Sequence, residues 1–139
     1  KFTRIAIEKF EKIIKTNPNS KYAKDAKFKL EYLNNYLARK EFEVGMYYLK
    51  NNAPSPAINR FSVVIKDFQG TSIIPQTLYR MYEAFEMLKL EDKSDQTYLI
   101  LKYNFPKSKW TEEITNKKNN VIKEPGYFKN IMNKMISIF

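Results

Sequence analysis

The chain has 139 residues, of which 43% are hydrophobic and 15% aromatic, so it is long and apolar enough to bury the core of one domain. It contains no Cys and no His, which excludes disulfides, thiol nucleophiles and imidazole bases and removes the commonest zinc ligands. The formal net charge is +10, which indicates either a negatively charged partner or lysine-rich faces turned to water.

The positive charge is carried almost entirely by lysine, because only four of the 25 cationic residues are arginines. The lysines are spread along the whole chain, which favours solvated faces over a single anion-binding patch. Lysine in place of arginine also argues against recognition of phosphates or bases, where the planar guanidinium fork is favoured. Nucleic acid is therefore an alternative partner and not the first choice.

Helical periodicity dominates the sequence and predicts an all-α fold, with no strand-like alternation. The motif NPNS at residues 17–20 ends the first helix, because Pro18 cannot continue it. Ser20 can cap the next helix, and no breaker follows until residues 51–56. One long helix is therefore predicted over about residues 21–50, and its expected buried stripe consists of Tyr22, Ala26, Leu30, Leu33 and Leu37.

Three further helix boundaries are expected in the middle of the chain. Ser55 followed by Pro56 is a typical helix start. Thr71 or Ser72 is expected to cap the following helix. The motif LEDKSD at residues 90–95 is expected to turn the chain before another helix.

The last third of the chain predicts two more helices. The motif NFPKS at residues 104–108 ends the preceding helix, and a polar helix follows from about Ser108. The motif EPG at residues 124–126 breaks it, and residues 127–139 form a short amphipathic helix. No apolar run approaches the roughly 18 residues of a membrane span. The sequence begins inside an amphipathic pattern with no cap before it, so we expect it to be part of a longer chain.

Two segments nearly repeat one another: AIEKFEKIIKTNPNS at residues 6–20 and AINRFSVVIKDFQGT at residues 57–71. This spacing resembles tetratricopeptide repeats, which are helix–turn–helix units with small residues where the helices touch. Such units bury a continuous core by stacking on their neighbours, so the resemblance implies a tetratricopeptide-like helical-hairpin solenoid. The matching positions are Ala6, Phe10, Pro18, Gly45, Tyr48, Ala57, Phe61, Leu78, Phe85, Tyr98 and Pro106.

A more specific resemblance covers about residues 6–110. The sequence there is similar to the C-terminal half of the BamD family, the outer-membrane assembly lipoproteins of Gram-negative bacteria. Position 45 is Gly where that family often has Ala, which keeps a small residue at this place. The residues that carry the resemblance are Tyr22, Ala23, Leu30, Leu33, Leu37, Ala38, Glu41, Val44, Tyr47, Tyr48, Asn59 and Arg60.

The resemblance implies a scaffold that works by protein docking. Members of this family are periplasmic, are anchored at the inner face of the outer membrane by an N-terminal lipid, and act with other lipoproteins of the assembly machinery. We expect the residue that carries this lipid to lie outside the sequence given. Their C-terminal repeats dock the last POTRA domain of BamA. By resemblance, we expect this chain to carry the docking half, with BamA as its partner and no nucleic acid.

Five residues are candidates for binding that partner. Arg60, beside Asn59 at the start of a predicted helix, can donate two hydrogen bonds to one carboxylate; the resemblance implies a carboxylate of BamA. The alternative is a solvated helix residue, and this alternative is stronger for Arg39 and Arg80. Tyr47 is expected to face a partner, because adjacent helix residues point in different directions and the repeat pattern assigns its neighbour to the core.

We expect residues 1–110 to form the repeats and residues 111–139 to form a C-terminal helical extension. The apolar stripe of that extension, with Lys129 and Lys134 beside it, is typical of a solenoid cap, a helix docked in a partner groove, or a helix lying on a membrane. The stripe consists of Phe128, Ile131, Met132, Met135, Ile136 and Phe139.

The sequence does not predict an enzyme. It shows no metal-ligand spacing, no nucleophile with a base and no phosphate-binding loop, so no catalytic residue, metal or cofactor is expected. Glu83 and Glu86 lie three residues apart on a predicted helix and are interpreted as solvated acids. Beside protein docking in outer-membrane assembly, two functions stay open: a basic helical repeat that binds nucleic acid, and a peptide-binding repeat protein of another pathway.

Overall fold

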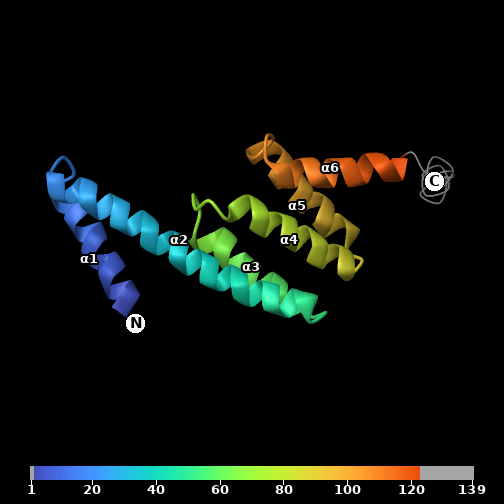
Figure 1. Ribbon diagram of the computed structural model, residues 1–139, viewed down its shortest axis with the longest axis horizontal. Coiled ribbons are helices and arrows are strands. Elements are labelled where there is room, and N and C mark those ends of the chain that lie inside the picture. The colour runs from blue at the N-terminus through green and yellow to red at the C-terminus, as the bar shows by residue number, and fades with distance from the viewer. Residues whose placement is uncertain (1, 123–139) are drawn as a thin grey trace.

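The computed structural model of the protein describes residues 2–122, and every regular element in that range is an α-helix. Each helix packs against the next one along the chain, and Figure 1 shows the stack running from α1 at one end to α6 at the other. The all-α, tetratricopeptide-like fold is therefore confirmed. The helix expected at residues 127–139 lies outside the described residues. The helices are α1 (Phe2–Thr16), α2 (Lys21–Lys50), α3 (Pro54–Asp67), α4 (Ile74–Met87), α5 (Glu91–Asn104) and α6 (Lys109–Ile122).

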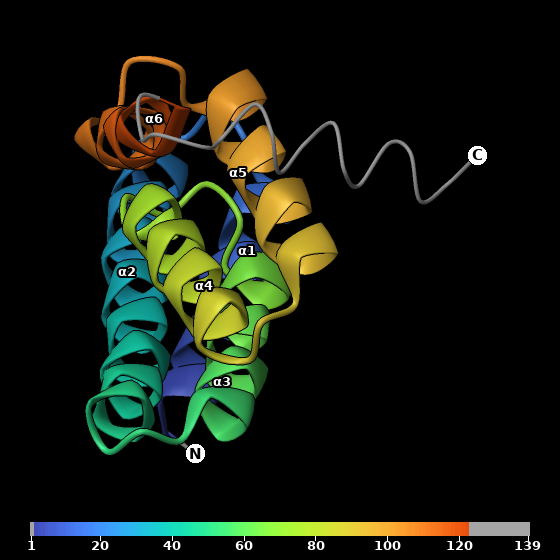
Figure 2. The ribbon, with the colours of Figure 1, turned by 90° about the vertical axis from the view of Figure 1, so that its right-hand side faces the viewer.

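The long helix α2 is the spine of the molecule. It spans 30 residues, which corresponds to about 45 Å. The backbone N–H of Ala23 donates to Oγ of Ser20 at 3.1 Å, so the predicted cap is confirmed. Helix α1 lies beside the N-terminal part of α2 and α3 beside its C-terminal part (Figures 1 and 2). Among the described helices, α1 packs against α2 alone.

Helices α2 and α3 approach each other closely at Gly45. A Cβ atom added to Gly45 of α2 would lie 2.4 Å from Cε1 of Phe61 in α3, so the Phe61 ring rests on the bare backbone of α2. Phe61 and Ala57 are fully buried, and the ring of Phe42 packs against Phe61 with the two centroids 5.7 Å apart. The small residue of one helix and the aromatic residue of the next thus meet within one helical hairpin.

One hydrophobic core continues from this contact into the C-terminal helices. Its members come from α2 through α6, which is how a stack of hairpins buries apolar surface that no single hairpin could cover. Leu101 of α5 and Ile114 of α6 are both fully buried. The core cluster comprises Ala38, Phe42, Ala57, Phe61, Val64, Ile73, Ile74, Leu78, Tyr79, Tyr82, Leu101 and Ile114. The expected division of the chain at residue 110 stays a prediction.

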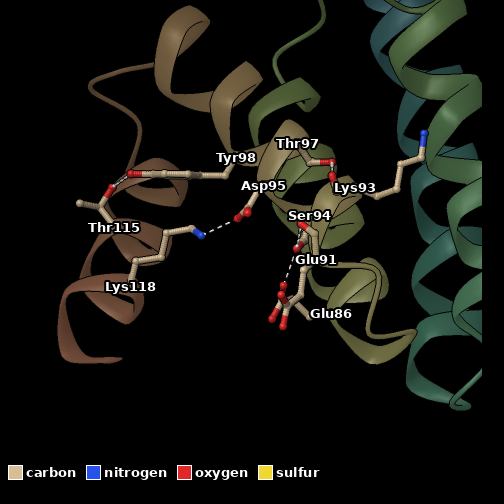
Figure 3. Close-up of polar contacts among 9 residues, drawn as sticks. All are labelled: Glu86, Glu91, Lys93, Ser94, Asp95, Thr97, Tyr98, Thr115 and Lys118. Atoms are coloured by element: carbon tan, nitrogen blue, oxygen red, sulfur yellow. Dashed lines mark hydrogen bonds and ion pairs between the residues drawn. The ribbon is translucent and has the colours of Figure 1, made fainter. Parts of the chain in front are cut away.

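Polar contacts attach α6 to α5 (Figure 3). The hydroxyl groups of Tyr98 and Thr115 lie 2.7 Å apart. Nζ of Lys118 donates to a carboxylate oxygen of Asp95 at 2.7 Å and lies 5.3 Å from the centroid of the Tyr98 ring. These contacts pair the end of α6 with the beginning of α5, so the two helices run antiparallel.

The predicted start of α3 was wrong by two residues. The helix begins at Pro54, and Ala53 stands at the cap position without a side-chain hydrogen bond. The physical reason is that Pro54 and Pro56 both lie in the first turn. Because proline has no N–H, two of the backbone donors that a cap would satisfy are missing, and proline is pre-shaped for the first helical position.

The predicted caps of α4 were also wrong. Ile73 stands at the cap position without a side-chain hydrogen bond, and the two candidate residues bond to other groups. Oγ1 of Thr71 donates to the carbonyl of Phe68 at 2.7 Å. The backbone N–H of Ser72 donates to Oδ1 of Asn35 at 3.2 Å, which ties the α3–α4 loop to α2.

Two further expectations differ from the structure. The turn before α5 comes earlier than residues 90–95, at Lys89, whose φ is 56°, and α5 already begins at Glu91. Acidic residues in a first turn suit the positive end of the helix dipole, so these residues belong inside the helix.

Tyr22 was expected to be buried in α2, but it is 78% exposed, and the residues of α2 that are buried beside it are Ala23 and Ala26.

We expect Gly45→Ala to lower the free energy of unfolding by about 1 kcal/mol. Alanine is favoured over glycine in a helix by about 1 kcal/mol, but the new methyl group must displace a fully buried ring, and overpacking costs about 1–3 kcal/mol. Urea denaturation measures the difference. In a Phe61→Leu background the same substitution should become neutral or stabilising, because the clash is relieved. Stabilisation by Gly45→Ala in the wild-type background would contradict the close contact.

We expect Tyr98→Phe to lower the free energy of unfolding by about 1 kcal/mol, because it removes the hydrogen bond to Thr115. Tyr103→Phe in the same helix is the matched control, since Tyr103 is 79% exposed. Removal of its hydroxyl group should change the free energy of unfolding by less than about 0.5 kcal/mol. Equal effects of the two substitutions, measured by urea denaturation, would show that the Tyr98–Thr115 contact does not hold α6.

Candidate protein-docking surface

Arg60 lies in the second turn of α3 and reaches across to α2. Its Nη1 atom donates to Oε2 of Glu41 at 3.2 Å. The Arg60 side chain is 46% exposed and that of Glu41 is 31% exposed, so the ion pair is open to water on one side. Glu41 was not expected to hold Arg60. The two residues are 19 positions apart, and only the packing of α2 on α3 brings them together.

The ion pair lies among partly exposed apolar side chains. On α2, Glu41, Val44 and Tyr48 follow one another at helical spacing and share a face; Val44 is 38% exposed and Tyr48 is half-buried. On α3, half-buried Val63 lies one turn after Arg60. Arginine is enriched in protein–protein interfaces, and their buried centres are more apolar than the rest of the surface. We refer to Glu41, Val44, Arg60 and Val63 as the α2–α3 face.

The other candidates on α2 and α3 do not share this face. Tyr47 is 65% exposed and packs edge-on against Tyr48 with ring centroids 5.7 Å apart. It lies six residues after Glu41, which places it about 120° away around α2. Arg39 is exposed and forms no ion pair within residues 2–122. Asn59 is exposed beside Arg60.

Arg80 is built into the packing of α4 against α6. Its Nη1 donates to Oε2 of Glu83 at 2.8 Å, and the guanidinium carbon lies 5.2 Å from the Tyr79 ring and 5.5 Å from the Trp110 ring. The side chain is 26% exposed, and its buried Nε finds no hydrogen-bond partner among the residues that the structure describes. These contacts give Arg80 a structural role between two helices, on a different part of the molecule from Arg60.

Tyr79 also joins α4 to α6 through Lys117. Nζ of Lys117 donates to the Tyr79 hydroxyl at 2.8 Å. Burial raises the pKa of Tyr79, and the hydrogen bond to Tyr79 raises the pKa of Lys117. Both groups therefore stay protonated at neutral pH, and the contact is one between a cation and a neutral phenol.

An open groove lies between α1 and α2, and the sequence did not predict it. Phe28 and Tyr32 of α2 are 76% and 70% exposed along one side of it, and Nζ of Lys29 lies 5.9 Å from the Phe10 ring. The recurrence of Phe and Tyr every four residues along α2 could have indicated an aromatic groove, but such a stripe is more often buried in the core. The groove has a volume of about 430 Å³ and is lined by Ala6, Phe10, Phe28, Lys29, Tyr32 and Leu33.

The repeat positions differ between the two copies of the repeated segment. Ala57 and Phe61 of α3 are fully buried against α2, whereas Ala6 and Phe10 of α1 are half-buried and line the groove. Farther along, Phe85 is half-buried, and Pro18 and Pro106 are exposed in the turns after α1 and α5.

The described residues hold no group of acidic, His or Cys side chains that could bind a metal ion. Glu83 pairs with Arg80, and Glu86 accepts a hydrogen bond from Ser94 (Figure 3), so both acids take part in helix packing. Among residues 2–122 no helix has the length and apolar character needed to cross a membrane.

Comparisons with known proteins agree with this architecture. The family model of YfiO, described as an outer membrane lipoprotein, matches residues 1–101. Proteins named outer membrane protein assembly factor BamD are 42% identical over 108 residues in Rickettsia prowazekii, 37% in Caulobacter vibrioides and 33% in Neisseria gonorrhoeae. Each alignment covers 78% of this chain and 43%, 35% and 40% of the relative, respectively.

The chain thus spans less than half the length of these curated relatives. These relatives are named as assembly factors, which is a non-catalytic role. A family match over more than two thirds of the chain, together with relatives above 30% identity, shows that this chain belongs to the YfiO/BamD family of outer membrane lipoproteins.

Proposed function

We propose that this chain is the part of a BamD-type assembly factor that docks the last POTRA domain of BamA, and that the α2–α3 face is the docking surface. The single observation that carries the proposal is the Arg60 side chain, 46% exposed and engaged through one nitrogen. A guanidinium in this state can donate hydrogen bonds to a second carboxylate, supplied by a partner. Hydrogen bonds between charged groups are stronger than those between neutral groups.

The apolar residues beside Arg60 give the proposed contact its second component. Val44 lies one turn from Glu41 and Val63 one turn from Arg60. Both are partly exposed, and their burial under a partner would release water from apolar surface. An arginine anchor surrounded by apolar contacts that exclude water is the common arrangement of residues that dominate binding energy. The partner side of such a contact would present an acidic side chain within an apolar rim.

The proposed setting follows from the family. An outer-membrane assembly factor that docks BamA through this half would work in the periplasm at the inner face of the outer membrane, together with other lipoproteins of the machinery. Membrane attachment would come from an N-terminal lipid. The net charge of +10 then belongs to lysine-rich solvated faces and to long-range attraction of an acidic partner surface.

We expect Arg60→Ala to weaken binding to the last POTRA domain of BamA from the same organism by about tenfold, because it removes a charge-assisted anchor. Isothermal titration calorimetry at two salt concentrations measures the affinity. Arg39→Ala is the matched control: it removes the same charge from an exposed arginine outside the α2–α3 face, and it should change affinity by less than about twofold. Because exposed ion pairs add little to stability, Arg60→Ala should leave thermal unfolding nearly unchanged.

Equal losses for Arg60→Ala and Arg39→Ala would show that net charge, and not the α2–α3 face, drives association. Absence of any POTRA binding, together with uptake of DNA that falls steeply with salt, would contradict the proposal and support the nucleic-acid alternative. The two salt concentrations separate these cases, since a protein contact with one central ion pair loses far less affinity with salt than neutralisation of many phosphates.

A further inference from the structure

The guanidinium of Arg60 is engaged on one side only. Nη1 is held by Glu41 at 3.2 Å, and within residues 2–122 neither Nε nor Nη2 has a hydrogen-bond partner. The Nε–Nη2 edge carries two parallel N–H donors, which match the two oxygens of a carboxylate. The free edge is therefore a site with two parallel donors for the carboxylate of an acidic side chain.

Glu41 is held in place by the packing beneath it. Its neighbour in the sequence, Phe42, packs against Phe61, and Phe61 in turn follows Arg60 and rests on Gly45. Because these buried rings fix α2 against α3, the backbones that carry Glu41 and Arg60 cannot slide past one another. The ion pair thus joins two points whose separation is set by the core, and it restrains a long side chain that would otherwise sample many rotamers.

We propose that Glu41 is a positioning residue for partner binding: it holds Nη1 and leaves the Nε–Nη2 edge of Arg60 free to take a partner carboxylate in bidentate geometry. This inference rests on the proposed function. Its benefit is pre-organisation, because a side chain that is already ordered loses less conformational freedom when the partner binds. Glu41 itself does not need to touch the partner.

The alternative role for Glu41 is competition, in which the partner carboxylate displaces it from Arg60. The two roles predict opposite effects of removing Glu41. A positioning residue supports binding, so its loss weakens the complex. A competitor opposes binding and adds like-charge repulsion, so its loss strengthens the complex.

The test uses the full chain and the same POTRA domain. We expect Glu41→Ala to weaken binding by about fivefold and Glu41→Gln by less than about twofold, because the glutamine amide oxygen can still accept from Nη1. Glu43→Ala is the matched control: it removes the same charge two residues away, on the opposite side of α2, and it should change affinity by less than about twofold. Arg60→Lys should lose nearly as much affinity as Arg60→Ala, because lysine keeps the charge but lacks the fork.

A double-mutant cycle separates positioning from a general structural effect. If Glu41 acts through Arg60, the Glu41→Ala effect disappears in the Arg60→Ala background, whereas an independent structural effect stays the same. Unchanged or tighter binding by Glu41→Ala, with Arg60→Ala still weakening the complex, overturns this inference and leaves the proposed function intact. No effect of Arg60→Ala overturns the proposed function itself.

Discussion

The contact between Gly45 and Phe61 is the constraint on which the rest of the structure depends. Because residue 45 has no side chain, the Phe61 ring can lie against the backbone of α2, and α3 approaches closely enough to bury Ala57 and Val64 completely. The position of α3 then sets the position of α4, which packs on it. The same approach brings Arg60 within reach of Glu41, so the core contact and the candidate docking surface are two consequences of one helix–helix distance.

Helices α1 and α6 are held by different kinds of contact. At the N-terminal end, α1 packs against α2 alone among the described helices, and the aromatic side chains between them border an open groove. At the C-terminal end, α6 joins the common core through Ile114 and adds cations over aromatic rings, with Lys117 over Tyr79 and Lys118 over Tyr98. Within residues 2–122, α6 therefore belongs to the common core, whereas α1 depends on its contact with α2.

The sequence was sufficient to predict the helices and the repeat, but not where side-chain oxygens would bond. Ser20 was identified as a cap from its residue type after the break at Pro18, and its hydroxyl oxygen does accept from the Ala23 N–H. Thr71 and Ser72 looked equally suitable, yet Ser72 is taken up by Asn35, 37 residues away, and a partner so distant leaves no trace in local spacing. The same limit applies to the candidate site: Arg60 stood out by composition, whereas its partner Glu41 became visible only once α2 lay against α3.

The rarity of arginine in this chain strengthens the case for the α2–α3 face. Only four arginines occur among 25 cationic residues, and within the described range two of them, Arg60 and Arg80, form ion pairs between charged side chains. Arg80 also stacks near two aromatic rings, a use of the planar guanidinium that lysine cannot reproduce. Within residues 2–122, Arg60 has no such rings and contacts its carboxylate through one nitrogen, which lysine could do equally well. The internal structure therefore does not account for an arginine at position 60, and the unused edge of its guanidinium is the part that a partner carboxylate would explain.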